Sequence, residues 1–171
     1  NEVKNLTITG NLSIQENAKI SFKGKNIEVR GTTSVSEGQV RTAVLSNDIV
    51  VILEDSKLND VQAVKKNSAF AFEGSTAVGA LTIHQNAKVS ASANATLSKV
   101  SISDSVSEVE LNASVENLHI TGKSVLALNG SGNISQAIVH SSGKIILGNQ
   151  IKIKNIVLPE GRTLQETFGN Y

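Results

Sequence analysis

The sequence predicts an all-β fold, a single-domain parallel β-helix (β-solenoid) of right-handed sense with about 19 residues in each coil. An apolar motif recurs along the chain at a nearly constant interval. Apolar residues also come in pairs separated by one mostly polar residue, the pattern of a strand with one buried face. Of the 171 residues, 48 are Val, Ile or Leu and 49 are Ser, Thr or Asn, while proline occurs once, a composition typical of strands and tight turns.

The repeated motif reads apolar, two residues, apolar, one residue, apolar. Its clear copies begin 18 to 20 residues apart. A repeat of this length is too short for a propeller blade or an ankyrin unit, and it fits one coil of a solenoid whose stacked coils share a continuous core. The copies are Leu58, Val61, Ala63; Val78, Leu81, Ile83; Leu97, Val100, Ile102; Val115, Leu118, Ile120; Ile134, Ala137, Val139; and Ile153, Ile156, Leu158.

A second apolar pair lies 11 to 14 residues after the start of each of the first five units, and in the last unit only Leu164 remains. The residues between the pairs are mostly polar, so we expect two or three short strands and polar corners in every coil. The pairs are Phe70 and Phe72; Val89 and Ala91; Val109 and Leu111; Leu126 and Leu128; and Ile145 and Leu147.

The N-terminal third is less regular. We divide the single domain 1–171 into less regular coils over 1–57, regular coils over 58–162 and a C-terminal cap over 163–171, and we expect an excursion of the chain near 36–48. The expected inward apolar groups of this third are Val3, Leu6, Ile8; Leu12, Ile14; Ile20, Phe22; Ile27, Val29; and Val50, Ile52.

The two ends of a solenoid expose strand edges and apolar core, so they need covers. At the C-terminus a turn begins at Pro159, and Leu164 and Phe168 then follow at the spacing of one helical turn. We expect these two side chains to cover the last coil. The strand pattern already begins at Val3, so we expect the N-terminal end to lack a cap and to continue into a further coil or domain.

Two other folds fit less well. A β-sandwich also has many short strands, but it needs no fixed period and its turns favour proline. Left-handed hexapeptide helices place an aliphatic residue at every sixth position, whereas six-residue steps from Val78 reach His84 and Ser90. The right-handed coil is therefore preferred.

Composition excludes several functional classes. The formal net charge is +1, from 16 basic and 15 acidic residues, so there is no electrostatic signature of nucleic-acid or membrane binding. The chain has no cysteine, which excludes disulfides and thiolate metal sites. The longest apolar run, residues 49–53, is far shorter than the roughly 20 residues of a membrane span.

No motif for chemistry stands out, and we expect no catalytic residue, no cofactor, no cofactor-binding residue and no metal ligand. His84, His119 and His140 are interpreted as exposed residues separated by whole coils. Glu108 and Glu110 should point to the same outward face, but an acid–base pair also needs one buried acid and a sugar cleft lined by aromatic residues. Calcium-binding loops and a column of like charge are also missing from the sequence.

Three segments carry a family resemblance: NLTITGNLSI at 5–14, KNIEVRGTTSV at 25–35 and FEGSTAVGALTIHQNAKVSA at 72–91. Together they resemble the β-solenoid regions of surface proteins of Gram-positive bacilli that carry S-layer homology modules. The match covers most of residues 3–91 in the same order and at similar spacing, and it rests largely on turn motifs. The resemblance implies a secreted, cell-surface location and implies no activity.

Three functions follow as hypotheses. The first is a non-catalytic structural or spacer module of a secreted bacterial cell-surface protein, whose partners are neighbouring domains. The second is a glycan-binding or adhesive module for cell-wall or host glycans, for which Phe168 and Tyr171 are the only aromatic candidates for stacking on sugars. The third is a polysaccharide-active β-helix enzyme. Nucleic acid and membrane are not expected as partners.

Overall fold

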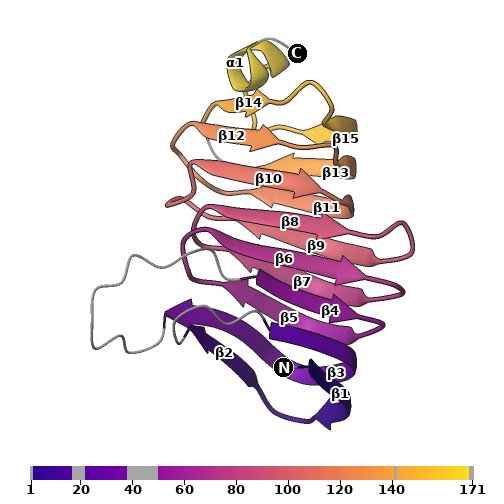
Figure 1. The fold of residues 1–171 in the computed structure, drawn as a ribbon. Helices are drawn as coiled ribbons and strands as arrows, with labels where there is room; N and C mark the ends of the chain where they lie inside the picture. The colour runs from indigo at the N-terminus through magenta and orange to yellow at the C-terminus, as the bar shows by residue number, and fades with distance from the viewer. Residues whose placement is uncertain (1, 17–21, 38–49, 141, 170–171) are drawn as a thin grey trace.

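The computed structural model confirms the β-solenoid, with about 19 residues per turn (Figure 1). It describes residues 2–16, 22–37, 50–140 and 142–169. The strands of these residues form one continuous parallel sheet that winds around the core, and α1 follows at the C-terminal end. The elements are β1 (Glu2–Ile8), β2 (Leu12–Glu16), β3 (Phe22–Glu37), β4 (Val50–Glu54), β5 (Lys57–Ala63), β6 (Ser68–Glu73), β7 (Ala77–Ile83), β8 (Ala87–Ala91), β9 (Thr96–Ile102), β10 (Glu108–Asn112), β11 (Ser114–Ile120), β12 (Leu126–Asn129), β13 (Asn133–Val139), β14 (Ile145–Leu147), β15 (Lys152–Val157) and α1 (Leu164–Phe168).

Two stacks of strands make the two walls of the regular coils. The even-numbered strands β4 to β14 pair with one another in order, and the odd-numbered strands β5 to β15 do the same (Figure 1). The long strand β3 joins the stacks, because it pairs with β1 and β2 on one side and with β4 and β5 on the other. Each strand between the end coils therefore takes its hydrogen bonds from the coils before and after it.

The apolar motif lies on the inner side of the odd-numbered strands. Its first position forms one column, in which Leu58 pairs with Val78, Val78 with Leu97, and so on through Val115, Ile134 and Ile153. All of these residues are buried except Ile153, which lies in the last coil and is partly buried. The repeat thus places equivalent side chains one strand spacing apart, about 4.8 Å, in a continuous core.

The inward register of β4 differs from the prediction by one residue. Val51 and Leu53 are buried, whereas Val50 and Ile52 are partly exposed. An unbroken aliphatic run over 49–53 carries no alternation, so the sequence could not show which face points inward. Pairing with β6 decides the register, because Val51 lies beside Phe70 and Leu53 beside Phe72.

The first described strand leaves apolar side chains outside the core. Val3 is 37% exposed and Leu6 is 43% exposed, although both were expected to point inward. Among the described residues β1 pairs only with β3, so no further coil covers its other side. The expected inward position of Ile20 and most of the expected excursion near 36–48 lie outside the described residues.

The helix α1 lies at the C-terminal end of the solenoid and contacts β14 (Figure 1). Thr163 begins it with a capping box: its hydroxyl accepts from Glu166 N, and its own N–H donates to the Glu166 carboxylate at 2.9 Å. Phe168 is 2% exposed and belongs to the core, as expected for a cap. Leu164 is 43% exposed, so its predicted covering role is wrong. Only the C-terminal end of this short helix, Thr167 and Phe168, enters the interior.

The inward and outward positions of one wall can be tested with a matched pair of substitutions. Leu118→Ala removes a fully buried side chain from the ladder and should lower the free energy of unfolding by about 2–5 kcal/mol. Ser101→Ala alters an outward position of the neighbouring β9 and should change the free energy of unfolding by less than about 0.5 kcal/mol. Chemical denaturation measures both, and equal effects would contradict the assignment of the two faces.

The cap can be tested in the same way. Phe168→Ala should lower the free energy of unfolding by about 3–5 kcal/mol, because it opens a cavity at the end of the core. Leu164→Ala is the control, since it keeps the helix and alters only an exposed side chain, and its effect should stay below about 1 kcal/mol. Thermal or chemical unfolding that ranks Leu164 above Phe168 would contradict this description of the cap.

Candidate functional site

Polar side chains at the corners of the coils bind the backbone of the next coil. In each case an Asn or Asp side-chain oxygen accepts a hydrogen bond from a backbone N–H that follows 19 to 21 residues later. We call these contacts the Asx clamps. They join Asn11 to Thr32, Asp55 to Ser75, Asn86 to Ser107, Asp104 to Lys123, and Asn112 to Ser131.

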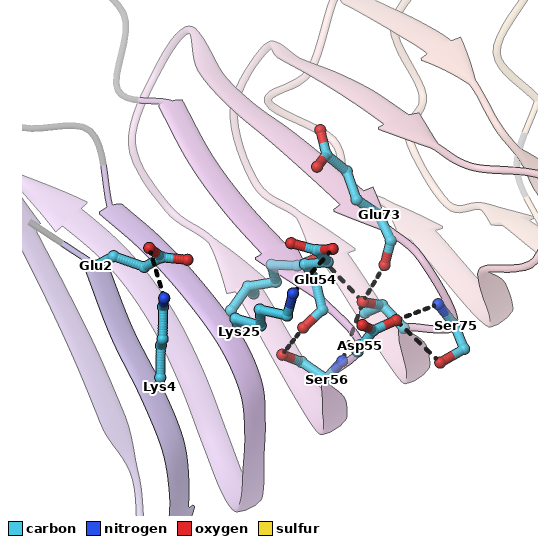
Figure 2. A network of polar contacts seen from close by, with 10 residues as sticks. Glu2, Lys4, Lys25, Glu54, Asp55, Ser56, Glu73 and Ser75 are labelled. Carbon is cyan, nitrogen blue, oxygen red and sulfur yellow. Dashed lines mark hydrogen bonds and ion pairs between the residues drawn. The ribbon is translucent and has the colours of Figure 1, made fainter.

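Figure 2 shows the clamp at Asp55 with its surroundings. The Asp55 carboxylate accepts from the backbone N–H of Ser75 at 3.0 Å and from its hydroxyl at 3.2 Å, while Asp55 N donates to Glu73 O at 3.2 Å. The bond from Ser75 N holds the pKa of Asp55 below its usual value, and the Ser75 hydroxyl and Lys25 add to this effect. Lys25 also forms an ion pair of 3.6 Å with Glu54.

Backbone conformation explains the residue types at this corner. Asn5, Asn26, Asp55 and Gly74 occupy equivalent places in successive coils, and all have a positive φ between 49° and 60°. Glycine, asparagine and aspartate tolerate this left-handed conformation better than other residues do. Asn26 also donates to Asn5 at 2.9 Å through their side chains. The Asn, Asp and Gly residues of this corner therefore permit the left-handed turn, and the bond between Asn26 and Asn5 also links two coils.

Next to the same corner, two buried side-chain hydroxyls form hydrogen bonds with backbone groups. Ser56 Oγ accepts from Ile27 N at 3.1 Å, and Thr76 Oγ1 accepts from Ser56 N at 3.2 Å. Ser56 Oγ in turn donates to Glu54 O at 2.9 Å (Figure 2). Both hydroxyls are committed to backbone partners, so neither is poised as a nucleophile.

The structure corrects the interpretation of the histidines as separate residues. His119 Nδ1 lies 2.8 Å from His140 Nε2 in the next coil. His119 pairs with Ile138 across β11 and β13, and His140 comes two residues after Ile138, so the two side chains meet along a diagonal. The sequence places them at different points of the repeat unit, and only the register between coils shows that a diagonal brings them together.

The third histidine lies in a chain of polar side chains on the same wall. Thr32 donates to Asp60 at 3.1 Å, Gln62 Nε2 donates to Asp60 at 3.0 Å, and His84 Nε2 lies 2.6 Å from Gln62 Oε1. Because Gln62 uses its amide nitrogen on Asp60, its oxygen accepts and His84 Nε2 donates. Ser103 Oγ donates to Ile83 O at 2.8 Å, so His84 does not activate it as a nucleophile.

Glu108 and Glu110 do point to the same outward side of β10, as expected. Glu110 contacts Lys88 Nζ at 3.9 Å and accepts from Asn112 at 3.0 Å, and Glu108 accepts from Asn129 at 3.4 Å. A surface hollow of about 250 Å³ lies between them and Asn86. Glu108 is exposed and Glu110 is half-buried, so the pair lacks the buried acid of a glycosidase.

The phenylalanines provide no platform for a sugar. Phe70, Phe72 and Phe168 are buried, and Phe22 is half-buried. Phe168 was a candidate for stacking on a glycan, and its burial in the cap removes it. Tyr171, the other candidate, lies outside the described residues.

Within the described part of the chain, no three His, Asp or Glu side chains gather closely enough to hold a metal ion. No helix among these residues is both long and apolar enough to cross a membrane. No family model, curated protein or solved structure matches the chain.

The clamp at Asp55 predicts a dependence of stability on pH. Since the folded-state pKa of Asp55 is lowered, its contribution is complete above the ordinary aspartate pKa, about 4, and is lost as the pH falls through the folded-state value. Asp55→Asn keeps an acceptor and the turn, so it should leave stability at pH 7 nearly unchanged and weaken the loss on acidification. Asp55→Ala should destabilise at both pH values. Urea denaturation at pH 7 and pH 3 measures this, and identical acid sensitivity of Asp55→Asn and wild type would contradict it.

Proposed function

We propose that the chain is a non-catalytic structural and spacer module of a secreted bacterial cell-surface protein. The observation that carries this proposal is the use of the Asx clamps. At five corners the side-chain oxygen binds the backbone of the neighbouring coil. These five Asn and Asp side chains are in this way committed to holding coils together.

The regularity of the core supports the same function. Each coil of the ladder from Leu58 to Ile153 repeats the same inward positions, so every coil adds one strand spacing, about 4.8 Å, to the length. A rod of this kind holds two neighbouring domains at a set distance, because its length depends only on the number of coils.

The cell-surface location rests on the resemblance to solenoid regions of surface proteins of Gram-positive bacilli. The absence of cysteine is compatible with such a location. The exposed apolar side chains of β1, Val3 and Leu6, offer a place where a further coil or a neighbouring domain would stack.

Removal of one whole coil tests the spacer function. Deleting residues 78–96 joins Ala77 to Leu97, which then takes the place of Val78 in the core column. We expect a cooperatively folded chain, shorter by about 4.8 Å in small-angle scattering. Deleting only residues 78–86 is the control, because it breaks the columns and should unfold the neighbouring coils. A whole-coil deletion that fails to fold would contradict modular length.

The adhesive and enzymatic functions predict results that differ from those of a spacer, and the unmodified chain can be used to test both. A spacer should show no saturable binding on an array of cell-wall and host glycans and should release no product from polysaccharides. Saturable binding that is lost in Lys88→Ala/Glu110→Ala would establish an adhesive module instead. Release of oligosaccharides would establish an enzyme.

A further inference from the structure

The contact between His119 and His140 is an edge-to-edge meeting of two imidazoles. The ring planes differ by 8°, and the ring centroids are 5.1 Å apart, which exceeds the 2.8 Å between the nitrogens by about two ring radii. The rings therefore lie nearly in one plane with His119 Nδ1 and His140 Nε2 facing each other. In this arrangement one nitrogen carries a proton and donates a hydrogen bond to the lone pair of the other.

We propose that His119 and His140 form a two-imidazole site for a divalent transition-metal ion, with Cu²⁺ bound most tightly. Two imidazole nitrogens from neighbouring coils face each other at the surface, 2.8 Å apart, so both can become ligands of one ion after the rings adjust. Imidazole suits copper, nickel and zinc, and copper heads the order of affinity among these ions. Water completes the coordination.

Binding needs a rotamer adjustment of the two side chains. Each metal–nitrogen bond is about 2 Å long, so an ion on the line between the facing nitrogens needs them about 4 Å apart instead of 2.8 Å, and an ion off that line needs the two rings to turn toward it. The proton between them moves to the far nitrogen of the ring that carries it, so both facing nitrogens present lone pairs while the rings stay neutral. His140 is exposed and His119 is half-buried, so solvent and the ion can reach the pair.

Local electrostatics favour a neutral His119 ring and also limit the affinity for the ion. Burial, followed by repulsion from Lys99 and from His140, lowers the pKa of His119 and so favours the neutral form of this ring. Lys99 on β9 is the cation that acts on the site from the preceding coil, and its charge also repels a divalent ion. Removing that charge should strengthen binding.

The chain contains an internal comparison. Gln62 and His84 occupy the same diagonal between β7 and its preceding strand β5 as His119 and His140 do between β13 and β11. The backbone geometry is shared, but only one imidazole is present there. His84 therefore serves as a control, and Gln62→His would recreate the pair.

The test is a titration of the full chain with CuCl₂ by calorimetry at pH 7.5, together with NMR of the histidine rings. We expect one ion per chain and paramagnetic broadening of His119 and His140 before His84. His119→Gln and His140→Gln should each weaken binding by about tenfold or more, while His84→Gln should leave it unchanged. Lys99→Gln should strengthen it, and lowering the pH to 5 should weaken binding to the wild type because protons compete for the same nitrogens.

Gln62→His should add a second equivalent of bound copper, which a general loss of folding could not produce. Equal broadening of all three histidines, unchanged affinity in His119→Gln or His140→Gln, or no second equivalent in Gln62→His would each overturn the proposal. Unfolding midpoints of the variants show that the fold is retained.

Discussion

The structure depends on the pairing of each coil with the next through parallel backbone hydrogen bonds. A coil cannot bury its apolar positions or satisfy its backbone alone, so it needs its neighbours. Once the register between two coils is set, equivalent residues stand in columns. The core ladder from Leu58 to Ile153 and the turn column from Asn5 to Gly74 are consequences of that single constraint.

The columns also determine where polar residues act. A side chain at a corner reaches the backbone of the following coil, and the Asx clamps use this reach at several corners. On the wall, a side chain reaches along the diagonal as well, which joins Gln62 to His84 and His119 to His140. One geometry therefore supplies both a structural contact and the proposed metal site.

Much of the fold follows from the sequence, because a period of about 19 residues repeats the same apolar positions. The motif beginning at Val78 or Val115 predicts a buried face without reference to any other segment. The run over 49–53 has no alternation, so its inward face depended on Phe70 and Phe72 in the next coil. Leu164 fits a capping pattern as well as Phe168 does, and the packing of the helix decided between them, because only its C-terminal end is buried.

By itself the sequence determined the fold class, the coil length and the inward column of the regular coils, since these depend on local periodicity. The spacing of Thr163 and Glu166 in the sequence also matches a capping box, which marks the start of the C-terminal helix. Tertiary structure alone decided which polar residues meet. His119 and His140 stand at different points of their units, and a contact between two coils depends on their register, which a single unit does not carry.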